Sequence, residues 1–577
     1  SETFEIRPLP EQPLAECLGG KGLATRLLLE MNPPGVDPLG PDNRLIFATG
    51  PFCGTRLWGG SRYGVFTKSP LTGLYCESYS GGKMPEALDA AGFDAVVIHG
   101  QATRPLALSV HPDGCSFHDA SDLWGADNFT AEDEALKRYV TPGAYPKRGA
   151  AVIGPAAENL VRFAIISNDY WRCAGRAGAG TVMGSKRIKA VVFQGDRKRR
   201  MANPEGVAAF AKAFAAAGKD NPGVKAYKAF GTTMMVAIMN TAGAFPARYW
   251  SQGTCDHWER LSGETFHKEH DVAPHACLKC FMACGRMATL KKGRHKGLKL
   301  EGPEYETIYA FGGLCMIEEM EEVVYLNDLC DRLGMDTITA GNLCVFAIEA
   351  VRRGRLDYPI DYGDADAVAG LVEKIARREG VGAILADGIV PASRHFGLED
   401  LAVHVKGMEP AGYDPRVLKG MGLAYATSDR GACHLRTTFY KPELARMIPA
   451  DAIEGKAAML IDFEDRLTLF DCLILCRFYR DMYTWEKLSE SIGLATGLPS
   501  DKASLQAVAG HVADMTRRFN LREGMTAEAD RLPSLLLKTT LPSGHALSEE
   551  EMAFMLADYY RLRGWDEQGE PASERRD

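Results

Sequence analysis

The segment HACLKCFMACGRM sets three cysteines at the spacing C-x2-C-x3-C, as Cys277, Cys280 and Cys284. Thiols grouped this closely in a large chain indicate a shared metal or cluster, which constrains how the surrounding backbone folds. A structural zinc site would want a second close pair of ligands, and His275 is the only nearby imidazole. A disulfide site is disfavoured by the odd number of cysteines and by a composition that fits a reducing compartment.

An iron–sulfur cube fits the spacing better, because three close thiolates can wrap one corner while a distant cysteine completes the set. Radical enzymes that cleave S-adenosylmethionine use the reverse order, C-x3-C-x2-C. For the fourth thiolate, FDCLILCRFYR offers Cys472 and Cys476. We favour Cys476, because DCLILC (residues 471–476, the second Asp motif) parallels DRLGMD (residues 331–336, the first Asp motif). In each, Asp is followed five positions later by Cys or Asp, after an apolar residue.

Composition limits the remaining possibilities. A chain of 577 residues predicts two to four domains. The net charge of −8 argues against nucleic-acid binding as the main activity. No apolar run is long enough to span a membrane, and the N-terminus lacks a secretory layout, so we expect a cytoplasmic protein. Nine isolated cysteines are interpreted as buried small apolar residues: Cys17, Cys53, Cys76, Cys115, Cys255, Cys315, Cys330, Cys344 and Cys472.

The predicted secondary structure changes from strands to helices near residue 200. Before it, RLIFATGPF, DAVVIHG, ALSVHPDG, AAVIGPA and KAVVFQG are short β-branched runs closed by Gly or Pro, which indicates strands. After it, PEGVAAFAKAFAAAG and EEMEEVVYLNDLCDRLG repeat apolar residues at helical spacing, with Gly334 as the C-terminal cap of the second. The sequence therefore predicts an α+β fold: a β-rich base (1–200) followed by two mainly helical domains (201–405 and 406–577).

Several stretches together resemble the tungsten-containing aldehyde:ferredoxin oxidoreductase family. GGKGLATRLL, LIFATGP, TKSPLTG, IGPAAENLVRFA, AGRAGAGTVMGSKRIKAV, GPEYETI, LGMDTI, RGACHLR and the cysteine cluster occur in the family's order. The resemblance implies one tungsten or molybdenum ion held by two pyranopterins, one [4Fe–4S] cluster, and Mg²⁺ bridging the pterin phosphates. It also implies a base domain that cradles the pterins, and Cys476 as the fourth cluster ligand.

The same resemblance assigns cofactor-binding residues. Each Asp motif would grip one pterin, through Asp331 and Asp336 in the first and through Asp471 and Leu475 in the second. The second motif has Ile474 where the family has glycine, so we expect its loop to be shaped differently. Further pterin contacts are expected from glycine-rich loops and a basic segment: Arg62, Ser80, Gly81, Arg172, Cys173, Arg176 and Arg436. Tyr79 stands where an asparagine is usual, so an amide contact is lost.

Two polar groups are expected to act on the substrate. One is a carboxylate of GPEYET, either Glu304 or Glu306, with the distance to the first Asp motif slightly favouring Glu306. The other is His434 in SDRGACHLR. Together they predict oxidation of an aldehyde to a carboxylic acid, with a glutamate as base and the imidazole orienting the carbonyl.

Three other functions compete with this interpretation. The same cofactor platform can run low-potential reductions of carboxylic acids or aromatic acyl-coenzyme A, although retention of GPEYET and CHLR favours aldehyde oxidation. Molybdenum enzymes related to formate dehydrogenase also use C-x2-C-x3-C, normally near the N-terminus. A structural iron–sulfur subunit without a metallopterin is the third. The resemblance implies ferredoxin or iron–sulfur and flavin subunits as electron acceptors, and a homodimer or hetero-oligomer. ARYWSQGTCDHWE, with Tyr249, Trp250 and Trp258, is either pocket wall or core.

Overall fold

The computed structural model describes residues 2–572, and its mixed architecture confirms the predicted α+β class with a β-rich N-terminal region. The two larger sheets both form before residue 196. Their strands are β1 Leu45–Ala48, β2 Tyr63–Lys68, β3 Tyr75–Ser80, β4 Ala95–Ile98, β5 Leu106–His111, β6 Gly114–Asp119, β7 Lys147–Val152, β8 Ile166–Asn168, β9 Arg172–Ala174 and β10 Ile188–Gly195. The five runs predicted as strands are β1, β4, β5, β7 and β10.

The first sheet has the order β3-β2-β1-β4 and is antiparallel throughout. The second has the order β6-β5-β10-β7-β8-β9, with β5 and β10 parallel. Strands β1 and β2 are buried along their whole length, since helices pack on both. This is why β1, LIFA, is a continuous apolar run and not an alternating pattern. The helices of this region are α1 Glu11–Cys17, α2 Gly20–Met31, α3 Met84–Ala90, α4 Asn128–Arg138, α5 Pro155–Glu158 and α6 Ala179–Ser185.

Helices dominate the chain beyond residue 200. They are α7 Pro204–Asp220, α8 Pro222–Phe230, α9 Met235–Thr241, α10 Gly263–Glu269, α11 Tyr305–Thr307, α12 Met320–Leu333, α13 Thr337–Arg352, α14 Ala365–Arg377, α15 Val381–Leu385, α16 Ile389–Phe396, α17 Lys419–Thr427, α18 Tyr440–Leu444, α19 Lys456–Leu473, α20 Trp485–Thr496, α21 Lys502–Arg522, α22 Ser534–Lys538 and α23 Glu549–Arg563. The two predicted helices are α7 and α12, and Gly334 closes α12 with φ of 84°. The three domain limits stay predictions.

A small sheet in this helical part was not foreseen from the sequence. Strands β11 Asp271–His275, β12 Gly285–Thr289 and β13 Lys299–Glu301 pair antiparallel in that order. Residues 276–284, here called the cysteine loop, connect β11 to β12. The sheet therefore holds both ends of the loop that carries Cys277, Cys280 and Cys284.

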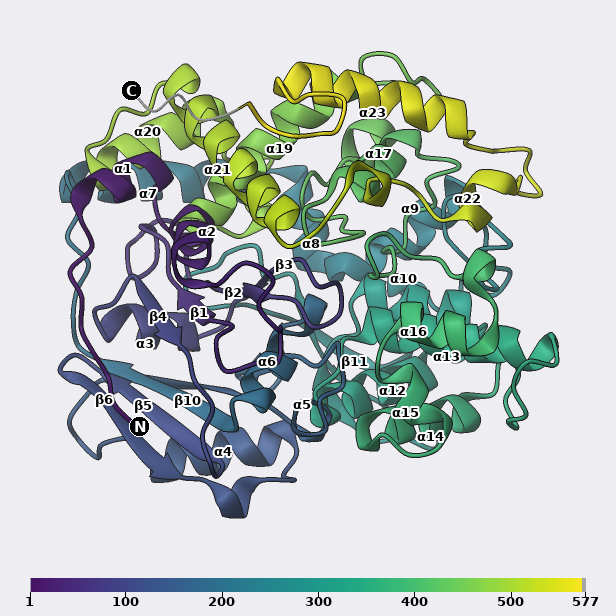
Figure 1. Cartoon of the computed structure of the whole chain (residues 1–577), viewed down its shortest axis with the longest axis horizontal. Coiled ribbons are helices and arrows are strands. Elements are labelled where there is room, and N and C mark those ends of the chain that lie inside the picture. Colours follow the sequence, from purple (N-terminus) through teal and green to yellow (C-terminus); the bar gives the residue numbers. More distant parts are fainter. Residues whose placement is uncertain (1, 573–577) are drawn as a thin grey trace.

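The C-terminal helices return to the N-terminal region. Helices α19 and α21 pack on α2, and α23 packs on α19 (Figure 1). Asn520 on α21 accepts a hydrogen bond from the Tyr75 amide on β3 at 2.8 Å. Figure 1 places α12–α16 on the opposite side of the molecule from α7 and α20. Within residues 2–572, no helix combines the length and apolarity needed to cross a lipid bilayer.

Candidate active site and cluster site

The cysteine loop and the second Asp motif meet in space. Tyr479, three residues after Cys476, donates a hydrogen bond to the Cys280 sulfur at 3.3 Å, and its hydroxyl oxygen accepts one from the Phe281 amide at 3.1 Å. The residues just before Cys280 and Cys284 both adopt left-handed backbone, Lys279 with φ of 52° and Ala283 with φ of 47°. Such conformations cost free energy in non-glycine residues and are concentrated at functional sites.

The four candidate ligand thiols are close enough to influence one another. Burial raises the pKa of Cys284 well above its ordinary value, and the charges of Glu304, Cys476 and Cys277 add to this rise. Burial and then the charge of Cys476 likewise raise the pKa of Cys280. The three cysteines of the loop and Cys476 are therefore neighbours.

Gly81 gives the cysteine loop room beside the N-terminal sheet. A Cβ atom at position 81 would lie 2.7 Å from the Cys277 sulfur and 3.3 Å from Nη1 of Arg62. The Gly81 carbonyl accepts a hydrogen bond from Asn168 at 2.9 Å, and the Ser80 hydroxyl donates to the same side chain at 2.8 Å. Arg62, Ser80 and Gly81 are therefore brought to the edge of the cluster site.

The first Asp motif ends α12 and starts α13. Asp331 accepts a hydrogen bond from Asn327 at 2.7 Å and has the Cys173 sulfur 4.0 Å away. Burial, followed by the charges of Asp328 and Glu301, raises the pKa of Asp331 well above its ordinary value. At the other end of the motif, Asp336 caps α13 and pairs with Nε of Arg176 at 3.1 Å.

The second Asp motif ends α19. Asp471 contacts Nη1 of Arg436 at 2.6 Å, and it also pairs with Arg477. Arg436 makes a second ion pair with the buried Glu77 on β3. Tyr79 lies under both arginines, with their guanidinium carbons 5.6 Å and 5.2 Å from its ring centre. Tyr79, at the position where the family has asparagine, thus makes cation–π contacts with both arginines.

The expected difference in loop shape at Ile474 is wrong for the backbone. Ile474 adopts φ of 50° and ψ of 47°, while Gly334 adopts φ of 84° and ψ of 48°. In both motifs the next amide bonds back five residues, Leu475 to Phe470 at 2.7 Å and Met335 to Cys330 at 2.9 Å. This 6→1 bond is the signature of a Schellman cap, so isoleucine keeps the turn that glycine normally provides.

Several buried polar atoms between the two motifs have no hydrogen-bond partner. They include Nε and Nη2 of Arg436, Nε of Arg430, Nδ1 of His434, Oε1 of Glu306 and Oε1 of Glu409. An unsatisfied buried group costs about 1–3 kcal/mol, so this concentration indicates space for a polar ligand with both donor and acceptor atoms. A pterin pair with phosphates has that chemistry, and the residues present therefore fit it.

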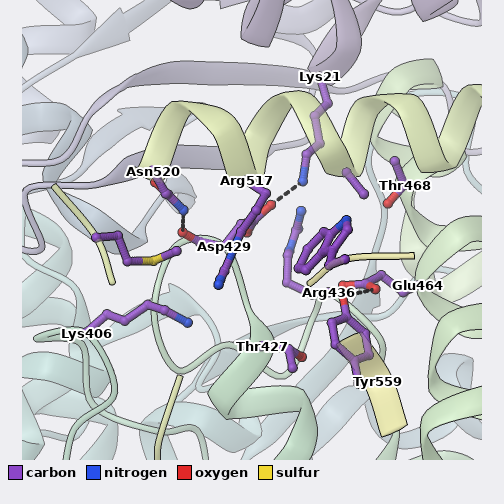
Figure 2. A pocket seen from close by; sticks show the side chains of 13 residues that line it. Lys21, Lys406, Thr427, Asp429, Arg436, Glu464, Thr468, Arg517, Asn520 and Tyr559 are labelled. Carbon is purple, nitrogen blue, oxygen red and sulfur yellow. Dashed lines mark hydrogen bonds and ion pairs between the residues drawn. The ribbon is translucent and has the colours of Figure 1, made fainter. Parts of the chain in front are cut away.

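A charged cavity continues from Arg436 toward the C-terminal helices (Figure 2). In it, Lys21 contacts Asp429 at 2.5 Å, and Asn520 donates to the Asp429 carbonyl at 2.6 Å. Tyr559 donates to Glu464 at 2.8 Å on the far wall. Lys21 also lies 3.2 Å from Glu77, which links this cavity to the Arg436 ion pairs.

Glu306 and His434 lie together. Oε1 of Glu306 is 3.5 Å from Nε2 of His434, and Oε2 accepts a hydrogen bond from the Gly412 amide at 3.0 Å. Burial raises the pKa of Glu306 to about 7, with the Gly412 bond acting against it. Burial and then the positive charge of Arg176 hold the pKa of His434 well below its ordinary value. The contact is therefore one between a neutral imidazole and a carboxyl group that titrates near neutral pH.

Glu304 points elsewhere. It accepts a hydrogen bond from the Thr232 hydroxyl, and its charge contributes to raising the pKa of Cys284. Arg172, which pairs with Glu301, lies near Cys277 and Cys284 as well. The structure thus separates the two candidate carboxylates: Glu306 beside His434, and Glu304 beside the cysteine loop.

Two family models cover nearly the whole chain. The N-terminal domain of aldehyde ferredoxin oxidoreductase matches residues 1–195, and its domains 2 and 3 match residues 209–577. The chain belongs to the aldehyde ferredoxin oxidoreductase family. It is therefore an oxidoreductase of the aldehyde ferredoxin oxidoreductase type.

Individual relatives show how much of the chain is similar to known proteins. A tungsten-containing aldehyde ferredoxin oxidoreductase of Pyrococcus furiosus is 34% identical over 99% of this chain and 96% of its own. The WOR-like subunit of an aliphatic sulfonate oxidoreductase from the same organism is 28% identical over 98% of this chain and 93% of its own. The active-site complex BamBC of benzoyl coenzyme A reductase has the same fold, with a TM-score of 0.83 at 23% identity, covering 99% and 93% of the two chains.

Sequence reasoning missed three groups of this oxidoreductase. Cys433 receives a hydrogen bond from Nη2 of Arg430 at 2.9 Å; although burial opposes ionisation, Arg430 and Arg436 lower the pKa of its thiol to about 7. Glu409 accepts a hydrogen bond from the Thr339 hydroxyl at 2.9 Å beside Arg176. The Tyr413 ring is tilted against that of His434, with the ring centres 5.5 Å apart. Cys433 was visible only as the neighbour of His434 in CHLR, and nothing local marked the other two.

Other predicted features belong to the core. Tyr249 and Trp250 are buried, Trp250 packs against Tyr309, and Trp258 is half-buried against the same core. Of the nine isolated cysteines, eight are buried and Cys115 is half-buried.

The group Glu269, His270 and Glu321 does not make a convincing metal site. Nδ1 of His270 accepts a hydrogen bond from the Lys291 amide at 3.2 Å, which leaves the proton of a neutral ring on Nε2. The ammonium of Lys292 lies 2.6 Å from Glu269 and 3.5 Å from Glu321, and it supplies the positive charge.

Proposed function

We propose that this chain oxidises aldehydes to carboxylic acids on a bis-pyranopterin tungsten (or molybdenum) centre. The balanced reaction is RCHO + H₂O → RCOOH + 2 H⁺ + 2 e⁻, with the electrons leaving singly through a [4Fe–4S] cluster. The observation that carries the proposal is the pair Glu306 and His434, 3.5 Å apart, in a buried site rimmed by unpartnered arginine nitrogens. When bound, the metal centre supplies oxygen transfer and the two-electron step.

The protein residues divide the remaining work. A carboxylate with a pKa of about 7 is partly ionised at neutral pH, so Glu306 can take a proton from water or from the hydrated aldehyde. The imidazole of His434 stays neutral, and its N–H can donate to the carbonyl oxygen of the aldehyde. The Gly412 amide fixes the other oxygen of Glu306, which holds the carboxylate facing His434.

For the cofactor, we assign one pterin to Arg176, Cys173, Asp331 and Asp336 and the other to Arg436, Asp471 and Leu475. Arginine forks pair bidentately with phosphate and carbonyl groups, which supports this assignment. Mg²⁺ would neutralise the pterin phosphates. The cube would be held by Cys277, Cys280, Cys284 and Cys476, with Arg62, Ser80 and Gly81 between it and the pterins.

Anaerobic purification followed by metal, iron and pterin analysis tests the cofactor, and an aldehyde panel with benzyl viologen tests the reaction. We expect one tungsten or molybdenum, two pterins and one cube per chain, together with aldehyde-dependent dye reduction. Protein that carries this cofactor but oxidises no aldehyde, and instead consumes a reduced dye in the presence of a carboxylic acid or aromatic acyl-coenzyme A, would assign the low-potential reductase. Zinc or no metal at the cysteines would contradict the proposal.

A further inference from the structure

The cysteine loop reaches the surface of the protein. Cys277, Cys280 and Cys284 are each only partly buried, as is Cys476. Leu278, between the first two, is one of the few large apolar side chains with substantial exposure, at 40%. A cluster bound here would lie close enough to solvent to exchange electrons with a protein docked on this face.

Basic side chains surround the loop on segments from distant parts of the sequence. The Leu278 amide donates to the Gly82 carbonyl at 3.1 Å, and Lys83 follows directly. The ammonium of Lys279 lies 3.5 Å from the Gly54 carbonyl, two residues before Arg56. Both Lys83 and Arg56 are exposed.

Helices α7 and α8 flank the other side of the loop. Trp58 packs its ring on Phe281 of the loop at 5.1 Å and donates to the Ala211 carbonyl at 2.8 Å, next to Lys212. Gly218 lies against the same Phe281 ring, next to Lys219. Lys212 and Lys219 are seven residues apart on α7, so they share one face of the helix.

A fifth cation comes from α8. The Lys228 carbonyl accepts a hydrogen bond at 2.8 Å from Arg286, which also bonds the Ala283 carbonyl in the cysteine loop. The side chains of Lys212, Lys219 and Lys228 are exposed.

The charges of these five side chains are not neutralised locally. None of Arg56, Lys83, Lys212, Lys219 and Lys228 forms an ion pair within the described chain, whose ion pairs are otherwise numerous. Three acids near these cations have partners: Glu86 pairs with Lys147 and Lys279, Asp169 accepts the amides of Lys83 and Met84, and Asp220 pairs with Lys225. Glu205, in the first turn of α7, is exposed and forms no ion pair among the described residues. A chain of net charge −8 thus carries unpaired positive charge around its cysteine loop.

We infer that this face, defined by Leu278, Arg56, Lys83, Lys212, Lys219 and Lys228, is the docking surface for an acidic electron-carrier protein of the ferredoxin class. The inference rests on the proposed function, which requires a one-electron acceptor: RCHO + H₂O + 2 oxidised ferredoxin → RCOOH + 2 reduced ferredoxin + 2 H⁺. Positive charge around the exit point attracts an acidic carrier and orients it, while Leu278 supplies a small apolar contact at the centre.

The test compares two electron acceptors on one enzyme. In the holoenzyme we replace Lys83, Lys212 and Lys219 together by Glu, and we assay aldehyde oxidation with benzyl viologen and with a purified acidic [4Fe–4S] ferredoxin. Viologen turnover should stay within about twofold, whereas kcat/KM for ferredoxin should fall at least about tenfold, and its decrease with added salt should weaken. Equal ferredoxin kinetics and salt dependence in variant and wild type would overturn the assignment.

A matched control removes three exposed and unpaired cations elsewhere, Arg355, Arg531 and Lys538, also by changing them to Glu. They lie after α13 and at α22, which Figure 1 shows on the opposite side from α7. This variant should keep both activities. Direct binding of the same ferredoxin to each anaerobic protein, measured at low and high salt, decides the surface even if no aldehyde is oxidised. The viologen assay of the wild type then judges the proposed function separately.

Discussion

The first and second Asp motifs end their helices with the same turn but hold their aspartates in opposite electrostatic settings. Asp331 has an amide and a thiol as neighbours and forms no ion pair within the described residues, and burial raises its pKa well above the ordinary value. Asp471 is held by two arginines. The last position differs as well: Asp336 caps the next helix, while Cys476 lies near Cys280 and Cys284 of the cysteine loop. The same helix-ending turn thus occurs in both motifs, and the surrounding side chains set the electrostatic environment of each aspartate.

A substitution at the last residue of the second Asp motif should give the largest effect. Replacing Cys476 by Ser should remove the cluster iron and lower viologen-linked turnover by more than about 100-fold, a loss beyond that of merely disturbing a ligand's partner. Iron analysis and the visible absorption spectrum of anaerobic protein measure this. Cys472→Ala is the control, because that thiol is buried four residues earlier on the same segment and should keep the iron. Full iron in the Cys476 variant would refute the assigned ligand.

Glu306 lies on the segment before the first Asp motif, and His434 lies on the segment before the second. Glu306→Gln should lower kcat by about 10²–10⁴-fold with metal and pterin retained, whereas Glu304→Gln should change it less. Because the carboxylate is the active form and its pKa is about 7, wild-type kcat should rise with pH through neutrality and then level off. A flat profile, or normal turnover in the Glu306 variant, contradicts its role as base.

The electrostatic difference between Asp331 and Asp471 can be measured as the change in the free energy of unfolding of each variant without cofactor. Asp471→Asn leaves Arg436 and Arg477 with an unbalanced buried charge and should destabilise by about 3–5 kcal/mol. Asp331→Asn replaces a carboxyl group whose pKa burial raises with an amide of similar shape, and it should cost less than about 1.5 kcal/mol. Thermal or urea unfolding at pH 7 compares them. Similar losses for both variants would remove the proposed electrostatic difference.

The residue that caps each helix should give a smaller effect than Asp471→Asn. Ile474→Gly relieves left-handed strain of about 1–2 kcal/mol but removes a buried side chain worth about 2–5 kcal/mol, for a net loss of roughly 2 kcal/mol. Its Cδ1 atom fills the space that the absent side chains of Gly20 and Gly64 leave. Gly334→Ala should cost about 1–2 kcal/mol for strain alone. A more stable Ile474→Gly protein would show that strain outweighs packing there.

Elements that depend on neighbouring residues in the sequence were predicted, whereas those that depend on distant residues were not. The strand run LIFA and helix α12 were readable because β-branched residues and 3.6-residue periodicity act within a few positions. The small sheet β11–β13 was not, because its strands are short, exposed in β11 and interrupted by Pro274. The backbone at Ile474 was misjudged, since its left-handed turn depends on space provided by Gly20 and Gly64, far away in sequence.

The candidate site divides in the same way. Glu306, His434 and the cysteines lie in dense motifs, and the structure brings Glu306 and His434 together. Glu77 carries no local signal, because its role arises only when Arg436 pairs both with it on β3 and with Asp471 at the end of α19. The choice between Glu304 and Glu306 likewise depended on side-chain direction, which spacing alone leaves open.

The separation of Cys284 and Cys476 in the sequence means that the four candidate cluster ligands are synthesised at different times. At 5–20 residues per second, the later cysteine leaves the ribosome about 10–40 s after the earlier one. Tyr479, whose hydroxyl bonds the Cys280 sulfur and the Phe281 amide, emerges later still. Until then the three thiols of a nascent chain lack the partners that order them, so maturation of the cluster must wait for synthesis of the C-terminal third, or the loop must be guarded from oxidation meanwhile.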